Sequence, residues 1–418
     1  MNKLNSQNLY DIANGSTLLA SGGGGSIKTA YSFIRQINQQ ETGVDLRLPA
    51  ELEAESWGGV VAAMGSPKSF EEIGLRGSET LAVKALEKAT SQKISFTIPV
   101  ETGSNIFVAM LSALKQDPPI FVVDGDGAGR SVPTLSCLTF SEDVAACPFA
   151  LLNAAKGENS VQGDIVINLE EETNFVKQAR IVEATTRPIL QTEGSFDGIA
   201  SIAGWAMTAE TAQTALIKGT ISTSQYIGQC LRQHHAIDKD ELNQELVADL
   251  AETLSKPYFL FPNRKKCTFV GIKEINKGDG FDYGLLQFTQ GEGSELNEIL
   301  IINQNENLLA WNTKVAHPIA MAPDLICCLG IVGDDLKEKI LTDFEGQERE
   351  IAEQSLSGLH GLSVEDLTPG QEVYLFSLPA NDRLKQDTNK IFQQLRAQFG
   401  YFGPYVSINE LSEKLSAK

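Results

Sequence analysis

The sequence predicts an α/β fold in which a three-layer domain with a largely parallel sheet is joined to a second, β-rich domain. Residues 94–124 read as a strand, an amphipathic helix and a short apolar strand, which together form one βαβ crossover. The run WGGVVAAM at 57–64 and the helical pattern at 78–90 add a further strand and helix. From residue 266 onward, short β-prone runs are separated by turn signals such as GDG and GEG, which favours a separate β-rich domain.

These patterns divide the chain into four parts. We expect an α/β domain at 1–170, a helical segment at 171–264 that packs on or completes it, a β-rich domain at 265–380, and a C-terminal segment at 381–418. The last segment contains FGYFGPYV at 399–406, which is unusually aromatic for a chain terminus. We expect it to return to the first domain and to help form the wall of a cleft.

Two carboxylates follow the strands of the predicted crossover. Glu101 comes after the strand at 94–99, and Asp124 ends the apolar run IFVVD. Parallel strands joined by a helix point the same way, so both side chains are expected at one edge of the sheet. In open α/β sheets that edge is where ligands bind.

The acidic glycine turn DGDGAGR at 124–130 adds Asp126 and Arg130 to the same edge. Such groups suit binding a metal, holding a water as a general base, or binding a substrate carboxylate through the guanidinium. The turn is not an EF-hand, because Val132 and Leu135 occupy the later ligand positions. An internal Asp–Arg salt bridge that fixes the loop is the structural alternative.

A run of four glycines at 22–25 lies between two predicted helices, at 4–19 and 28–39. Backbone N–H groups of Gly23, Gly24 and Gly25 would approach an anion at the start of the second helix, where the helix dipole favours negative charge. The alternative is a tight interhelical turn. No nucleotide is expected, because the run lacks GKS or GKT and no strand leads into a GxGxxG.

Composition excludes several classes of function. With 34 basic and 54 acidic residues among 418, the net charge is −20, which argues against a nucleic-acid surface. The chain shows no signal peptide and no long apolar run, so we expect a cytoplasmic protein without a membrane partner. The six cysteines form no CxxC pair and are expected as buried thiols, while the four histidines are scattered. The sequence therefore shows no ligand pattern for a divalent metal and does not exclude one as a cofactor.

Taken together, the motifs resemble the S-methyl-thiohydantoin desulfurase family, formerly a domain of unknown function that often occurs beside hydantoinase/oxoprolinase proteins. The resemblance covers nearly the whole chain. It is carried, in order, by GSTLLASGGGG at 15–25, GSP at 65–67 with Glu71 and Glu72, PVETGSN at 99–105, DGDGAGRSVP at 124–133, QNENL at 304–308 and FGYFGPYVSI at 399–408. Two positions depart from the family pattern: Thr134 replaces an acidic residue, and Ser104 replaces a glycine.

The resemblance implies an enzyme that hydrolyses a C–S or C–N bond in a small hydantoin-like or S-alkyl thiohydantoin substrate. In that scheme Glu101 is the general base, Asp124 or Asp126 orients a water or metal, and Arg130 holds an anionic substrate group. The remaining substrate contacts are expected from Asn105, Asn305, Glu306 and the glycine loop. The competing hypothesis is a non-catalytic binding or scaffold subunit that works beside a hydantoinase/oxoprolinase-type partner. A homo-oligomer stays open.

Overall fold

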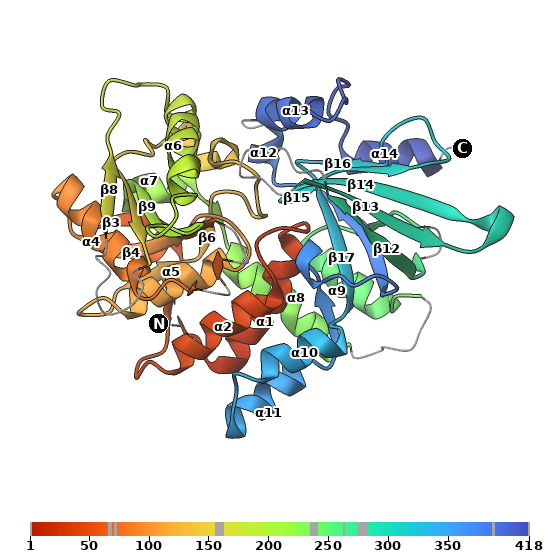
Figure 1. The fold of residues 1–418 in the computed structure, drawn as a ribbon, viewed down its shortest axis with the longest axis horizontal. Helices are drawn as coiled ribbons and strands as arrows, with labels where there is room; N and C mark the ends of the chain where they lie inside the picture. The colour runs from red at the N-terminus through yellow and green to blue at the C-terminus, as the bar shows by residue number, and fades with distance from the viewer. Residues whose placement is uncertain are drawn as a thin grey trace. The chain divides into compact units, whose positions relative to one another are not determined.

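The computed structural model describes residues 2–65, 69–70, 73–154, 163–234, 241–261, 264–274, 283–386 and 389–416 (Figure 1). The chain forms two compact units. The first, which we call the α/β unit, comprises Met1–Leu9, Thr29–Gly129 and Thr134–Ser222. The second, which we call the antiparallel unit, comprises Tyr10–Lys28, Arg130–Pro133 and Thr223–Lys418.

The α/β unit contains an eight-stranded mixed sheet. Its central strands β2, β5, β4 and β3 are parallel, and antiparallel strands extend the sheet on both sides. The strand order is β1 (Asn2–Lys3), β2 (Asp45–Arg47), β5 (Phe121–Val123), β4 (Ile94–Pro99), β3 (Trp57–Gly65), β9 (Ile199–Thr208), β7 (Phe149–Asn153) and β8 (Asp164–Ile167). A separate short pair joins β6 (Gly125–Asp126) to β10 (Ile217–Lys218).

The predicted βαβ crossover is confirmed. Helix α5 (Asn105–Leu114) connects β4 to the parallel strand β5, and all its residues from 106 to 114 are buried. The glycines of β3 allow close packing against the neighbouring strand: a Cβ atom on Gly58 would lie 2.5 Å from the ring atom Cζ of Phe96. The strand run WGG therefore makes room for an aromatic side chain.

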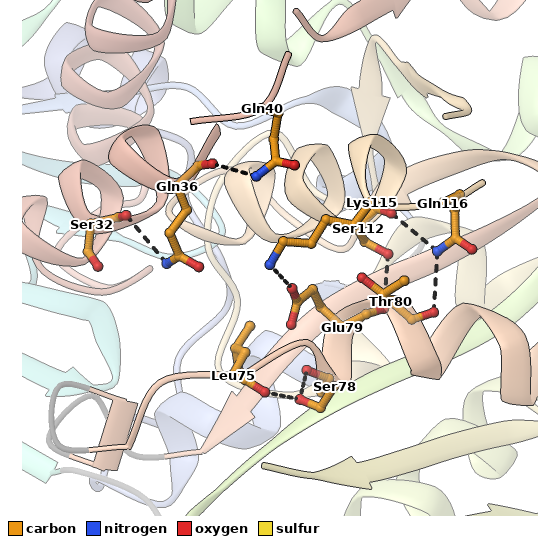
Figure 2. A network of polar contacts seen from close by, with 11 residues as sticks. Ser32, Gln36, Gln40, Leu75, Ser78, Glu79, Thr80, Ser112, Lys115 and Gln116 are labelled. Carbon is orange, nitrogen blue, oxygen red and sulfur yellow. Dashed lines mark hydrogen bonds and ion pairs between the residues drawn. The ribbon is translucent and has the colours of Figure 1, made fainter. Parts of the chain in front are cut away.

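Helix α4 (Ser78–Thr90) packs on α5 and on the sheet, and a buried polar link joins the two helices (Figure 2). The Nζ atom of Lys115 lies 2.9 Å from Oε1 of Glu79, and the Ser112 hydroxyl donates to the Glu79 carbonyl oxygen at 2.9 Å. The Glu79 side chain is almost fully buried, and this ion pair gives its carboxylate an oppositely charged partner. Helices α6 (Phe175–Leu190) and α7 (Ala209–Ala215) complete the unit.

The antiparallel unit is built on a nine-stranded sheet, which confirms the predicted β-rich second domain. Strand β14 shows why these residues pair, since Ile299 and Ile301 are fully buried and alternate with half-buried neighbours. The strand order is β16 (Ala320–Met321), β15 (Glu306–Asn312), β14 (Asn297–Gln304), β13 (Tyr283–Gln290), β12 (Cys267–Glu274), β19 (Glu372–Leu378), β17 (Leu325–Ile331) and β18 (Leu359–Gly361), with β11 (Tyr258–Phe259) paired to β19.

The helices of the antiparallel unit surround this sheet. They are α9 (Gln244–Thr253), α10 (Asp334–Leu341), α11 (Gly346–Ser355), α12 (Asp382–Gln386), α13 (Asn389–Ala397) and α14 (Ile408–Ser416). Three helices divide between the units along their length, namely α1 (Ser6–Leu19), α2 (Ile27–Asn38) and α8 (Thr220–Gln233). In the described part of the chain, no helix combines the length and apolar character that crossing a bilayer requires.

The two units differ from the expected domain boundaries. The segment predicted as helical at 171–264 divides, with α6 and α7 in the α/β unit and α9 in the antiparallel unit. The C-terminal segment packs on β15 and β16 of the antiparallel unit, where a return to the first domain was expected. The physical reason is Asp324, whose carboxylate accepts hydrogen bonds from the Tyr405 hydroxyl at 2.8 Å and the Ile408 N–H at 2.6 Å.

Candidate functional site

Glu101 follows β4 at the carboxyl edge of the parallel strands, as predicted, and its side chain is half-buried. Asn105, at the start of α5, donates from Nδ2 to Glu101 Oε1 at 3.3 Å. The other end of the same amide accepts a hydrogen bond from the Ala63 N–H of β3 at 2.9 Å. Asn105 therefore fixes the orientation of the Glu101 carboxylate relative to the sheet.

Asp126 is fully buried in the acidic turn and is surrounded by donors. Its Oδ1 atom accepts from the N–H groups of Ala128 at 2.8 Å and Gly129 at 2.6 Å, and Oδ2 accepts from the Thr102 hydroxyl at 2.6 Å. Burial raises the pKa of the Asp126 carboxyl, and these hydrogen bonds oppose that shift. Asp126 thus joins the acidic turn to the residue that follows Glu101.

Asp124 is also buried, and it caps the first turn of α8. Its Oδ1 atom accepts from the N–H groups of Ile221 at 3.0 Å and Ser222 at 3.1 Å, and Oδ2 accepts from the Ser222 hydroxyl. A carboxylate at a helix N-terminus is stabilised by the free N–H groups and by the helix dipole. The contacts of Asp124 are therefore those of a helix cap.

Arg130 belongs to the antiparallel unit and is fully buried. Its Nε donates to the Ser131 carbonyl oxygen at 2.8 Å, and its Nη1 donates to the carbonyl oxygens of Pro323 at 2.6 Å and Asp324 at 2.9 Å. These bonds hold the guanidinium against the segment between β16 and β17. The turn that looked continuous in sequence is thus divided, with its aspartates in one unit and its arginine in the other.

The glycine loop and the QNEN turn lie against each other in the antiparallel unit. A Cβ atom on Gly23 would lie 2.6 Å from Cγ of Glu306, and a Cβ atom on Gly22 would lie 2.7 Å from Cγ of Asn307. The Asn307 N–H also donates to the Ser21 carbonyl oxygen at 2.8 Å. Two motifs that the sequence places far apart therefore form one structure, in which the small size of the glycines allows the contact.

The turn between β14 and β15 consists of Asn305, whose neighbours Gln304 and Glu306 pair with each other. Asn305 has a φ of 57°, which asparagine tolerates better than most residues. Asn303 stabilises the turn, since its Nδ2 donates to the Asn305 carbonyl oxygen at 3.2 Å and to Asn307 Oδ1 at 3.0 Å. The amides of this motif thus build the turn on which Glu306 is presented to the glycine loop.

The start of α2 is bound by acidic side chains that the sequence reasoning missed. The Ser26 N–H donates to Glu365 Oε2 at 3.1 Å, and the Ile27 N–H donates to Asp366 Oδ1 at 3.2 Å. The Ser26 hydroxyl also donates to Asp366 Oδ1 at 2.6 Å. The predicted anion-binding helix start is therefore occupied by carboxylates of the chain itself, and the half-buried Gly24 and Gly25 remain the candidates for a ligand contact.

A sequence signal for Asp366 exists in hindsight. Ser363 stands three residues before it, and Asp366 accepts from both the N–H and the hydroxyl of Ser363. This local capping pattern places the carboxylate, but nothing in it indicates that a helix start 339 residues earlier in the chain is its second partner. Burial raises the pKa of the Asp366 carboxyl.

The predicted site residues thus form two sets. The α/β unit brings together Glu101, Asn105, Asp124 and Asp126, and the antiparallel unit brings together the glycine loop, Asn305 and Glu306, with Arg130 in the same unit. Within the described ranges, no three His, Cys, Asp or Glu side chains are arranged to hold a metal ion. Asp126 and Asp124 already accept hydrogen bonds on both oxygens, so they fit a metal poorly.

Two family models match consecutive parts of the chain. The model of an S-Me-THD-like N-terminal domain matches residues 7–162, and that of an S-Me-THD-like C-terminal domain matches residues 177–408. The crystal structure of a protein from Chromobacterium violaceum is similar over 98% of this chain and 100% of its own, with a TM-score of 0.73 and 25% identity. No curated protein matches the chain. Among the motif residues, Ser66, Pro67, Glu71 and Glu72 lie outside the described residues.

Proposed function

Because the chain belongs to the S-methyl-thiohydantoin desulfurase-like family, as its motifs predicted, we propose that it is a hydrolase of small hydantoin-like or S-alkyl thiohydantoin compounds. The two family domains cover nearly the whole of this chain, so the proposal concerns both of them. The reaction is cleavage of a C–S bond, or of a ring C–N bond, by water.

One observation carries the mechanism. Of the three carboxylates predicted to be catalytic, Glu101 alone is half-buried, whereas Asp124 and Asp126 are buried among backbone donors. A general base must reach both solvent and substrate, and a carboxylate that caps a helix cannot do so without breaking the cap. Glu101 is therefore the proposed base, while Asp126 and Asp124 position the loop around it.

In this scheme Glu101 removes a proton from water as the water oxygen bonds to the ring carbon that carries sulfur. The C–S bond then breaks, one water proton leaves with the thiol, the other goes to the adjacent ring nitrogen, and the ring carbon keeps the new oxygen as a carbonyl. Asn105, in the same unit as Glu101, is proposed to stabilise the developing negative charge.

The test compares Glu101→Gln with the wild-type protein and with Glu55→Gln, a matched change at an exposed surface position. Thiol release from S-alkyl thiohydantoins and ring opening of hydantoins are measured together with thermal unfolding and metal content. We expect Glu101→Gln to lose about 10²–10⁴-fold in turnover without loss of stability, because general-base catalysis contributes that much. Unchanged turnover in Glu101→Gln would remove Glu101 from the mechanism.

The same geometry also supports a second candidate, the non-catalytic binding or scaffold subunit. Two of the three acidic residues predicted to act in catalysis are bound by backbone N–H groups, which argues against a chemical role for both. A scaffold would bind hydantoins without turnover alone and would raise the activity of a hydantoinase/oxoprolinase-type enzyme when the two are mixed. Turnover by the purified chain alone excludes this candidate.

A further inference from the structure

Arg396, on α13 of the antiparallel unit, is a buried cation with an unused binding edge. Its exposed fraction is 0%, and its Nη1 donates to the Ala322 carbonyl oxygen. Its Nε and Nη2 atoms are equally buried and form no hydrogen bond with any described residue. These two nitrogens lie on one edge of the planar guanidinium, the edge that binds both oxygens of a carboxylate at once.

The buried carboxylate near Arg396 is already bound by other donors. Arg396 donates to the carbonyl oxygen of Ala322, close in sequence to Asp324. The Asp324 carboxylate accepts from the Ala380 N–H, the Tyr405 hydroxyl and the Ile408 N–H. The buried Nε–Nη2 edge of Arg396 thus has no acceptor among the described residues, and a bound anion would stabilise it.

The surroundings of this edge favour a small organic anion. The Tyr405 ring centroid lies 5.8 Å from Cζ of Arg396, and the Tyr401 N–H donates to the Arg396 carbonyl oxygen at 3.2 Å. The aromatic segment 399–406 therefore covers the arginine. Within it, Phe402 is 79% exposed, so the segment lies at the surface, and a ligand at Arg396 would require it to move aside.

We propose that Arg396 binds the carboxylate of a small planar organic acid through Nε and Nη2, beneath the aromatic segment 399–406. A carboxylate matches the planar pair of donors, because its two oxygens accept from both nitrogens at once. The fork also holds two oxygens of a phosphate or sulfate, but the remaining oxygens of either anion would need further donors that Arg396 does not supply. This site lies outside the residues proposed to act in hydrolysis, so it does not depend on that proposal.

The test titrates the full-length protein with benzoate, acetate, phosphate and sulfate at constant ionic strength, using calorimetry and thermal unfolding. We expect saturable binding of benzoate and acetate by the wild-type protein, weakened about tenfold or more in Arg396→Lys, which keeps the charge and loses the fork. Arg383→Lys, on α12, is the matched control and should bind as the wild type does. Equal binding by Arg396→Lys and wild type, or tighter binding of phosphate or sulfate, would overturn the proposal.

A second measurement needs no variant and therefore holds if Arg396→Lys fails to fold. Crystals of the wild-type protein are grown with benzoate, and the electron density around Arg396 is inspected. A carboxylate within hydrogen-bond distance of Nε and Nη2 supports the site. Benzoate bound only elsewhere, or no bound benzoate at saturating concentration, refutes it.

Discussion

Both units of this protein bury carboxylates among backbone N–H groups. The units differ in the burial of a second acidic residue, Glu101 in one and Glu306 in the other. In the α/β unit, Asp124 and Asp126 accept backbone N–H groups. In the antiparallel unit, Asp366 does the same at the start of α2. Beside them, Glu101 is half-buried and held by an amide, whereas Glu306 is buried against Gly23.

This comparison shows that an acidic residue in a glycine-rich turn is weak evidence for catalysis. Glycine and aspartate are enriched in turns partly because aspartate binds the backbone N–H groups that turns leave free. Access to solvent distinguishes a carboxylate that can act in chemistry from one that is buried in a structural role. By that measure Glu101 is the strongest catalytic candidate in the α/β unit.

The largest predicted effect tests the structural role of Asp126 in the α/β unit. We expect Asp126→Ala to lower the free energy of unfolding by about 3–5 kcal/mol, because it leaves two buried N–H groups and the Thr102 hydroxyl without their acceptor. Chemical denaturation measures this loss. Asp126→Asn keeps one oxygen acceptor and should cost about 1 kcal/mol. If Asp126→Ala is as stable as Asp126→Asn, the hydrogen bonds of Asp126 do not stabilise the turn.

A second prediction concerns the pH dependence of stability in the antiparallel unit, which also buries His360. Burial lowers the pKa of its imidazole to about 4. The unfolded chain then binds a proton at this histidine below about pH 6.5, whereas the folded chain binds it only below about pH 4. The free energy of unfolding therefore decreases as the pH falls through this range. Between pH 7 and pH 4 the wild type should lose about 3 kcal/mol more than His360→Asn, whose amide can still donate to Gly358.

The measurement is the free energy of unfolding as a function of pH for both proteins. Buried Asp324 and Asp366 have raised pKa values and contribute a slope of opposite sign, which is common to both and cancels in the difference. Parallel curves for the two proteins would show that His360 titrates normally in the folded state.

The smallest expected effect concerns the contact between the glycine loop and Glu306. Gly23→Ala should cost about 2 kcal/mol, because the added methyl group overlaps the Glu306 side chain and forces it to move. Gly163→Ala in the α/β unit is the matched control, since its Cβ would meet nothing closer than 3.7 Å and should change stability by less than about 0.5 kcal/mol. Equal effects in thermal unfolding would contradict the packing described for the loop.

The sequence was sufficient to predict local structure and the family, for reasons visible in particular residues. The apolar runs of β4, α5 and β5 are strong because each element is buried, and the parallel crossover follows from their order. The position of Glu101 after a strand also follows from the chain. The motifs were sufficient to identify the family, because each is a contiguous stretch that can be recognised without knowledge of the fold.

Long-range partners could not be predicted in this way. The carboxylate of Asp124 is bound by N–H groups 97 and 98 residues later, and Ser26 is bound by a side chain 340 residues later. No pattern of composition or periodicity specifies such pairs, because either end is satisfied by any acceptor or donor that the fold supplies. The division of DGDGAGR between two units has the same origin.

The hydrogen bond from the Ser26 hydroxyl to Asp366 has a consequence for folding during synthesis. During synthesis the first turn of α2 leaves the ribosome long before its acceptor is translated, so that turn waits for most of the polypeptide before it is complete. A gene fragment that stops at the end of the N-terminal family domain would therefore encode a helix without its cap, however well the boundaries are chosen.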